Sequence, residues 1–403
     1  MTMLSFEDAL AHLFTVAQSA EQRPREIESV ATLSAQGRIL AHDLVSTVDV
    51  PPLDNSAMDG YALRCADVAA PGSRLPIGQR IAAGQVGQPL VPGSAARILT
   101  GAPVPEGADA VVMQEHCELD SDCVIVNHMP RLGANIRRRA EDIGVGRGVL
   151  TQGQRLDARH LGVAASVGAA RLQVFRRLRV ALFSTGNELT APGEALKPGG
   201  IYNSNHTTLY SLLVGLGCEV TDLGNAPDQL QATRTLLRHA AVAHDLIVTS
   251  GGVSVGDEDY VKPAVIAEGR LDLWKIAIKP GKPLASGRIG QAAFIGLPGN
   301  PVSSFVTFVM LVRPFILKLQ GAALTAPRAQ ALRAGFAWKG DARREFLRAR
   351  LDPHQPGSVE LFPHQGSGVL TSCSWSDGLI DNPPNTPLAV GDTISFIPFT
   401  ELL

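Results

Sequence analysis

The chain has 403 residues, with 36 Lys and Arg against 38 Asp and Glu, which gives a formal net charge of −2. At about one domain per ~150 residues, this length predicts two to four domains. The balanced charge offers no global field for nucleic acid or an anionic membrane, so any anion site must be local. We therefore expect neither nucleic acid nor a membrane as a partner.

The N-terminus and the cysteines indicate the compartment. The five cysteines are scattered, odd in number and without a CxxC pair, which argues against a disulfide framework and a thiolate metal site. MTMLSFEDALAHLF is acidic where a signal peptide is basic, and predicts an amphipathic helix opened by Ser5, with Asp8 three residues on. The most apolar run, Phe305 to Leu317, contains Arg313 and Pro314 and is shorter than the roughly 20 residues of a membrane span. We expect a soluble, cytoplasmic protein.

Proline and glycine mark the first boundaries along the chain. Residues 1–50 have mostly helical patterns, which end at the helix-breaking pair Pro51-Pro52. Residues 51–139 alternate short apolar segments with Pro and Gly turns, which predicts a compact β-rich domain. Residues 140–177 return to a loop and a small helical pattern. The β-rich domain is therefore predicted to be inserted into an N-terminal linker or helical domain.

The second half of the chain differs in kind. Residues 178–326 alternate apolar strand-like runs with helix-like segments, which predicts a doubly wound α/β sheet covered on both faces. The expected strands are Val180 to Phe183, Leu246 to Val248, Trp274 to Ile278 and Ala293 to Ile295, and the clearest helix is Asp228 to Ala243. Residues 327–403 have strand-like runs between turns and predict a small C-terminal β barrel or sandwich.

Four loops of the predicted α/β sheet carry unusual chemistry. Ligands of such sheets bind beyond the carboxyl ends of the strands. The loops are Leu182 to Asn205, Ser250 to Tyr260, Ile278 to Leu284 and Gly296 to Ser304. Their glycines allow close approach of backbone N–H groups, which favour phosphate, and Lys279 and Lys282 add positive charge. We expect a nucleotide or oxyanion pocket.

Three carboxylates, Asp257, Glu258 and Asp259, follow the glycine-rich turn at Ser250. Beside a bound phosphate they require a cation, and Mg²⁺ takes one or two carboxylates together with phosphate oxygens. We infer that Asp259, with Asp257 or Glu258, serves such an ion. The plainer alternatives are a tight turn and a solvated helix start. The occurrence of several such loops at one edge favours the binding site.

The β-rich region has its own candidates. Asp59 lies in a Met-Asp-Gly-Tyr turn of DNSAMDGYAL, and Thr100 follows a strand-like run in ILTGAPVPEGADAVVMQE. An Asx turn accounts for Asp54 and Asn55 but not for Asp59. Thr100 is a candidate ligand hydroxyl, although each segment could be a simple β-turn.

At these residues the sequence resembles the molybdopterin molybdenumtransferase family, also called the MoeA family, which is related to the C-terminal domain of gephyrin. The matching motifs are NSAMDGYA (Asn55 to Ala62), ILTGAPVPEGADAVVMQE, STGNEL (Ser184 to Leu189), SGGVSVGDEDYVK (Ser250 to Lys262), IKPGKPL and GLPGNPVSS. The resemblance covers essentially the whole chain. One departure is Ala140, which stands before Glu141 and Asp142 where the family often has glycine.

The resemblance implies an enzyme that inserts molybdenum from molybdate into adenylylated molybdopterin and releases AMP, assisted by Mg²⁺. It also implies an elongated four-domain homodimer, in which the α/β domain of one subunit faces the β-rich insertion of the other. The catalytic residues would be Asp59, Glu188 and Asp259, of which Glu188 and Asp259 would hold the metal. The substrate-binding residues would be Thr100, Asp142, Asp228, Ser250, Gly251, Gly252, Lys275, Lys279, Pro298, Pro301, Arg350 and Ser372. Expected partners are the molybdopterin adenylyltransferase and apo-molybdoenzymes or their chaperones.

Two other functions remain open on the sequence. A molybdopterin adenylyltransferase-like enzyme would make the adenylylated intermediate, but such an enzyme needs only the α/β domain. A non-enzymatic gephyrin-like scaffold would not need acidic and basic groups such as Asp59, Glu188 and Asp259 in one cleft.

Overall fold

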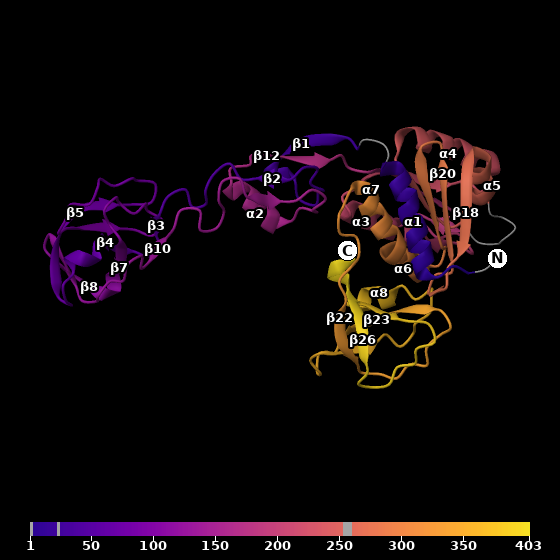
Figure 1. Cartoon of the computed structure of the whole chain (residues 1–403). Coiled ribbons are helices and arrows are strands. Elements are labelled where there is room, and N and C mark those ends of the chain that lie inside the picture. Colours follow the sequence, from indigo (N-terminus) through magenta and orange to yellow (C-terminus); the bar gives the residue numbers. More distant parts are fainter. Residues whose placement is uncertain (1–2, 22–24, 253–259) are drawn as a thin grey trace.

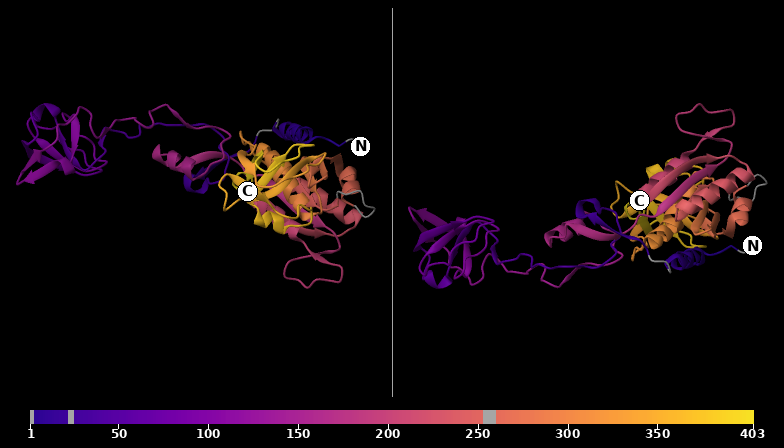
Figure 2. Two further views of the ribbon diagram at one scale, coloured as in Figure 1. Left: turned by 90° about the horizontal axis from the view of Figure 1, so that it is seen from below. Right: turned by 90° about the horizontal axis from the view of Figure 1, so that it is seen from above.

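The computed structural model describes residues 3–21, 25–252 and 260–403. The molecule is elongated, with a β-rich part at one end of a narrow arm and an α/β layer with a C-terminal β part at the other end (Figures 1 and 2). The chain passes along the arm twice, because β1 (Ile27–Ala31) pairs with β12 (Arg171–Phe175) and β2 (Leu44–Val45) pairs with β11 (Gly148–Leu150).

Helix α1 (Phe6–Glu21) begins as the sequence predicts. The Ser5 hydroxyl accepts the Asp8 N–H at 3.0 Å and donates to the Asp8 carboxylate at 2.7 Å, which satisfies a free N–H of the first turn. Buried Leu13 faces the same core as α7 (Arg313–Gln320). Helix α1 therefore packs on the α/β layer and not on the arm (Figure 1).

The arm contains less helix than the sequence pattern suggests. After α1, residues 27–31 and 44–45 are strands, separated by the short 3₁₀ turn η1 (Thr32–Ser34). On the return pass, α2 (Ala158–Ser166) is capped by Asp157, whose carboxylate accepts the N–H groups of Arg159 and His160. Leu40, Leu150 and Val174 lie in the small core of this part.

The inserted part is a sheet of order β7-β4-β6-β5-β9-β8, beside a short pair formed by β3 (Asn55–Ser56) and β10 (Ile136–Arg137). The strands of the sheet are β4 (Gly60–Leu63), β5 (Ser73–Ile81), β6 (Ala95–Ile98), β7 (Ala110–Met113), β8 (Cys117–Asp120) and β9 (Cys123–Val126), with 3₁₀ turns η2 (Cys65–Asp67) and η3 (Gln114–His116). The β-rich character expected for this region is confirmed.

Replacing Gly60 by alanine should destabilise the inserted sheet. A Cβ at Gly60 would lie 2.0 Å from the backbone oxygen of Val112 on the paired strand β7, which cannot rotate away. Overpacking of this kind costs roughly 1–3 kcal/mol or more. Urea unfolding of Gly60→Ala should show this loss. Gly78→Ala in β5 is the control, because its Cβ would meet only the Ser94 hydroxyl oxygen at 3.8 Å, and an equal loss in both variants would contradict the steric explanation.

The α/β sheet has the order β16-β13-β17-β21-β20-β18. Its strands are β13 (Arg179–Thr185), β16 (Glu219–Ala226), β17 (Leu246–Ser250), β18 (Gly269–Lys275), β20 (Pro283–Ile289) and β21 (Ala292–Leu297). Strands β16, β13, β17 and β21 are parallel, and β20 and β18 extend the sheet with antiparallel pairing. The parallel part is confirmed, but the expected strand Trp274 to Ile278 is wrong. Strand β18 ends at Lys275, and Ile278–Lys279 forms β19 in the C-terminal sheet.

Helices cover both faces of this sheet, so alternate residues of its strands are buried in two separate cores. Val180 and Leu182 face a core with α1, α3 and α6, whereas Ala181 and Phe183 face a core with α4 and α5. The helices are α3 (Ser204–Gly215), α4 (Leu230–Ala243), α5 (Val261–Glu268) and α6 (Pro301–Thr307), which continues through a π-helical turn η4 (Phe308–Val312) into α7. The short pair β14 (Leu189–Thr190) and β15 (Ile201–Tyr202) precedes α3.

Within the described residues, one helical stretch, Pro301–Gln320, is long and apolar enough to cross a membrane by length and composition. Its most apolar window is 83% buried inside the protein. It serves as the central core helix of the α/β layer.

The C-terminal strands close into a ring. Their order is β23-β24-β22-β26-β25, and β25 pairs again with β23, which forms the expected barrel. The elements are β22 (Gln330–Ala334), β23 (Arg344–Leu351), β24 (Ser358–Leu361), α8 (Thr371–Trp375), β25 (Gly378–Asn382), β26 (Thr393–Pro398) and the 3₁₀ turn η5 (Phe399–Glu401). Strand β19 from the α/β layer pairs with β23, so the two parts are joined by a shared strand edge.

Candidate functional site

A cavity of about 550 Å³ lies beyond the carboxyl ends of β17 and β21, between the α/β layer and the C-terminal barrel. Four of the predicted residues line it: Gly251, Gly252, Lys279 and Pro298. Pro301 begins α6 directly after the lining residue Asn300, and Ser250 is the buried last residue of β17. The remaining lining residues are Pro280, Gly281, Lys282, Pro283, Gly299, Ser303, Arg343, Gln365, Gly366 and Ser367.

The glycines of the cavity wall are required by backbone conformation and by packing. Gly251 and Gly252 have φ of 87° and 65°, in the left-handed region that side chains disfavour. A Cβ on Gly251 would lie 2.9 Å from the Thr185 oxygen, and one on Gly252 would lie 2.3 Å from a Val261 methyl carbon. The Gly-Gly turn therefore packs directly against the end of β13 and the start of α5, and leaves its backbone open to the cavity.

Lys279 is engaged within the protein. Its ammonium lies 3.1 Å from a carboxylate oxygen of Asp341 and 3.1 Å from Oε1 of Glu345. Glu345 is fully buried and also accepts the Trp338 indole N–H at 2.7 Å. The positive charge of Lys279 is thus matched by two carboxylates of the C-terminal part. Exposed Lys282, on the same loop, adds a further cation to the cavity wall.

A buried cation of the C-terminal part that sequence reasoning missed lies behind the lining loop at Gly366 and does not itself line the cavity. Arg348 is fully buried, and its guanidinium donates to the Ser372 hydroxyl at 3.2 Å and to the Gly366 carbonyl at 3.2 Å. Burial lowers the pKa of Arg348 to about 10. It thereby links the predicted residue Ser372 to the lining loop at Gly366. The predicted Arg350 lies outside the lining residues, in an ion pair with Glu360.

A second group of predicted residues adjoins the cavity wall. The backbone N–H of Asn187 donates to the Asp228 carboxylate at 3.1 Å, which holds the end of β16 beside the turn that carries Glu188. Glu188 is exposed. The backbone oxygen of Thr185, at the start of this turn, would lie 2.9 Å from a Cβ on Gly251, so the turn packs behind the lining residue Gly251. Asp257, Glu258 and Asp259 lie outside the described residues.

A third group lies in the inserted part, at the far end of the arm from the cavity (Figure 1). The Asp59 carboxylate accepts both the backbone N–H and the hydroxyl of Thr100, each at 2.7 Å, and these bonds lower the pKa of Asp59. Asp142 follows β10 in the connection to the arm, after Ala140, whose φ of 61° is the conformation that glycine favours. Within one chain, this group does not meet the cavity.

Lys275 stands apart from the cavity lining, at the end of β18. Its carbonyl accepts the Leu4 N–H at 2.8 Å, which ties the N-terminal segment to this strand end.

Family models match most of the chain. The models are the MoeA N-terminal region (domain I and II) over residues 4–168, a probable molybdopterin binding domain over residues 181–318, and the MoeA C-terminal region (domain IV) over residues 331–399. A molybdopterin molybdenumtransferase of Haemophilus influenzae is 39% identical over 386 residues, which span 94% of this chain and 96% of that protein. The chain belongs to the MoeA family.

Further relatives agree with this membership. The molybdopterin molybdenumtransferase 2 of Mycobacterium tuberculosis is 38% identical and covers 88% of this chain and 90% of its own length. A solved structure of a molybdopterin biosynthesis MoeA protein from Pyrococcus horikoshii matches with a TM-score of 0.83 and 26% identity, over 98% of this chain and all of that one. A second structure of such a protein from Pyrococcus matches with a TM-score of 0.76 and 31% identity, over 99% of both chains. The multidomain fold expected from the sequence is confirmed.

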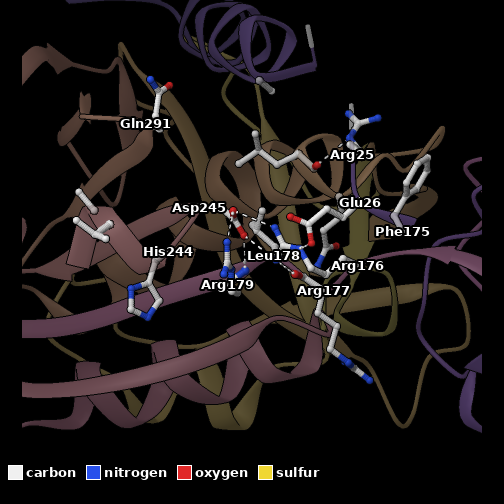
Figure 3. Close-up of a pocket in the computed structure, with 15 residues that line it drawn as sticks. Arg25, Glu26, Phe175, Arg176, Arg177, Leu178, Arg179, His244, Asp245 and Gln291 are labelled. Carbon is white, nitrogen blue, oxygen red and sulfur yellow. Dashed lines mark hydrogen bonds and ion pairs between the residues drawn. The ribbon is translucent and has the colours of Figure 1, made fainter. Parts of the chain in front are cut away.

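A different cavity of this MoeA-family chain, of about 320 Å³, lies at the amino ends of β13 and β17, where Arg179 and Asp245 line it (Figure 3). Its cations are already engaged. Asp245 pairs with Arg176 at 3.1 Å and with Arg179 at 3.7 Å, and Glu26 pairs with Arg176 at 3.0 Å. Arg25 donates to the Leu319 carbonyl at the end of α7. These bonds join the arm to the α/β layer, so the cavity is a structural junction.

Across the described part of the MoeA-family chain, no three His, Cys, Asp or Glu side chains gather closely enough to hold a metal ion. Glu188, the described member of the expected metal pair, nevertheless supplies a hard carboxylate donor of the type that Mg²⁺ prefers. Its carboxylate turns back over Gly186, where a Cβ would lie 2.6 Å from Oε2.

The contacts of Asp341 predict a pH dependence of stability. Hydrogen bonds from the Arg343 side chain, with further ones from the Arg343 N–H and Lys279, lower the pKa of Asp341 far below its usual range. A carboxyl with a depressed folded-state pKa stabilises the protein above its unfolded pKa of about 3.9, and this contribution is lost as the pH falls. The unfolding free energies of wild type and Asp341→Asn, from urea titrations, should differ by a constant amount above about pH 5, and the difference should shrink progressively as the pH falls from about 4 towards the depressed folded-state pKa. A difference that also stays constant over this acidic range would contradict this.

Proposed function

We propose that the chain is a molybdopterin molybdenumtransferase, which inserts molybdenum from molybdate into adenylylated molybdopterin and releases AMP. The observation that carries this proposal is the cavity where the Gly251-Gly252 turn, the loop from Lys279 and the Pro298 loop meet Arg343 and the 365–367 loop of the C-terminal part. Anionic substrates fit such a wall of open backbone and cations. The names of the Haemophilus influenzae and Mycobacterium tuberculosis relatives support the same transfer.

The residues at this cavity have two roles: some would bind the substrate anions, and others hold the loops of the wall in place. Lys282 and Arg343 line the cavity as cations and would hold the phosphate or molybdate oxygens, with Arg343 oriented by its ion pair with Asp341 at 3.1 Å. Arg348, held by Ser372, fixes the Gly366 loop that forms the opposite wall. Lys279 pairs with Asp341 and Glu345 and so holds its loop against the barrel. Its ammonium also contributes positive electrostatic potential to the cavity.

Mg²⁺ would be held by Glu188 and Asp259, whose carboxylates have the donor chemistry that this ion takes together with phosphate oxygens. When bound, the ion withdraws charge from the phosphoanhydride that is cleaved. Asp228 orients the Glu188 turn by accepting the Asn187 N–H.

The proposed active form is a homodimer. Asp59 and Thr100 lie in the inserted part beside β4 and β6, and Asp142 lies in the connection from β10 to the arm, so a second copy is needed to bring them to a cavity. Asp59 would then position substrate or metal through its Thr100-bound carboxylate. Mixing Asp59→Ala and Lys282→Ala chains should restore part of the activity that each lacks alone, because a mixed dimer holds one intact composite site.

The remaining assignments follow from the same proposal. Lys275, Pro301 and Arg350 would shape or border the substrate site, and the chain divides into domains at residues 1–50 with 140–177, 51–139, 178–326 and 327–403. The protein is soluble and cytoplasmic. It would receive its substrate from a molybdopterin adenylyltransferase and pass its product to apo-molybdoenzymes or their chaperones.

The test follows AMP release from adenylylated molybdopterin and Mg²⁺, with and without molybdate. The proposal predicts release that depends on molybdate. Binding without cleavage would support a gephyrin-like scaffold instead. Formation of the adenylylated intermediate from ATP would support an adenylyltransferase-like enzyme.

A further inference from the structure

A histidine outside the site residues above links two strands of the α/β sheet. His206 lies in the first turn of α3, and its Nε2 is 2.9 Å from Oδ1 of Asp222 on β16. Its Nδ1 is 3.2 Å from the hydroxyl oxygen of Ser184 on β13. The Asn203 side chain, which caps α3, accepts the His206 backbone N–H at 3.1 Å and fixes the first turn of the helix that carries the ring.

These contacts set the direction of the hydrogen bonds. A carboxylate can only accept, so the pair with Asp222 places a hydrogen on Nε2 of His206. In the neutral ring Nδ1 then accepts, and Ser184 donates to it. The connectivity is that of an acid, histidine and serine triad. Ser184 is fully buried, however, so no substrate atom can reach its hydroxyl, and a nucleophilic role is ruled out.

The network instead meets the cavity wall. The register between β13 and β16 shifts between Leu182 and Ser184, at the point where Asp222 also accepts the Gly224 N–H at 2.7 Å. Thr185, the next residue, backs the Gly251 turn that lines the cavity. One residue further, the Gly186 carbonyl accepts the Asn225 side chain at 3.0 Å. The carboxyl end of β13 is thus held from its buried side by the bond between His206 and Ser184.

We propose that His206 is a positioning residue for the transfer reaction, which acts through Ser184 on the turn from Thr185 to Glu188. This inference rests on the proposed function. Asp222 selects the tautomer of His206, and the Ser184 bond then fixes where the turn meets Gly251. If this turn shifts by a fraction of an ångström, the groups it carries are misplaced relative to the reacting atoms. Such a shift lowers kcat more than it raises KM.

Two substitutions of His206 separate its contacts. The amide of asparagine reaches the position of Nδ1, so His206→Asn keeps the Ser184 bond, whereas His206→Gln reaches the position of Nε2 and keeps the Asp222 bond. We expect His206→Gln and Ser184→Ala each to lower kcat by about tenfold at nearly unchanged KM, the scale seen when a supporting partner is removed. His206→Asn should lose less than about twofold, and the double variant His206→Gln with Ser184→Ala should be no slower than either single one. His239→Gln, on the exposed side of α4, is the control.

A second measurement does not depend on activity. Amide hydrogen exchange at residues 185–188 should be faster in His206→Gln and Ser184→Ala than in wild type, and unchanged in His239→Gln. Wild type without molybdate-dependent AMP release would overturn the proposed function but not this exchange pattern. The positioning role would be overturned if wild type is active but His206→Gln has the wild-type kcat and the wild-type exchange. It would also be overturned if His206→Asn and His206→Gln lose equal activity. Ser184→Ala, which removes one oxygen, keeps the test available if a His206 variant does not fold.

Discussion

Replacing Gly299 by leucine should abolish turnover while the protein keeps its fold. Gly299 lines the cavity, and a Cβ built on it meets no heavy atom within 4 Å, so the larger side chain enters the space assigned to substrate. Its φ lies outside the left-handed region, so leucine adds no backbone strain there. We expect at least a ~100-fold loss of AMP release, since misplacement of a substrate by about 1 Å costs this much.

Gly148→Leu is the matched control for this variant. Gly148 also has open space at its Cβ and an unstrained φ, but it lies on the arm, in β11. Circular dichroism and thermal unfolding of both variants should match wild type, and only Gly299→Leu should lose activity. If Gly299→Leu turned over substrate at the wild-type rate, the reaction would have to take place elsewhere on the molecule.

Replacing Lys279 by alanine should reduce both activity and stability. The substitution removes a cation from the cavity wall and leaves Glu345 buried without its charged partner, although Trp338 still donates to it. Loss of a hydrogen-bond partner at a buried charged group costs roughly 1–3 kcal/mol or more. We expect a lower midpoint in urea unfolding together with a loss of AMP release.

The double variant Lys279→Ala with Glu345→Gln separates the two effects. A neutral glutamine no longer needs a cation, and its side-chain oxygen can still accept from Trp338, so much of the stability should return. The activity should remain low, because the positive charge at the cavity is still missing. Recovery of activity along with stability would mean that Lys279 acts only by holding the barrel in place.

The sequence predicted the cavity wall because parallel strands end at one edge of a sheet. Gly251 and Pro298 come from loops that are well separated in the chain, yet the parallel strands β17 and β21 before them place the loops together. Lys279 reaches the same wall through β19, which pairs with the C-terminal sheet and not with the strand the sequence predicts. The partners of Lys279 could not be predicted in this way. Asp341 and Glu345 lie more than 60 residues further on, in a barrel whose docking on the sheet depends on the pairing of β19 with β23.

The identity of the C-terminal cation also depended on the structure. Arg348 and Arg350 lie two residues apart on β23, so strand alternation puts them on the same face. Burial distinguishes them, because Arg348 contacts Ser372 and Gly366, whereas Arg350 pairs with Glu360 near the end of the strand. The contact between Asp59 and Thr100 is likewise tertiary, since their motifs are 41 residues apart.

The most direct test of the central claim is a single turnover of the purified protein with adenylylated molybdopterin, Mg²⁺ and molybdate. The pterin product is separated and its molybdenum content is compared with the AMP released. The proposed function predicts one molybdenum on the pterin for each AMP, and neither product when molybdate is omitted. AMP release without molybdenum on the pterin, or at the same rate without molybdate, would contradict it.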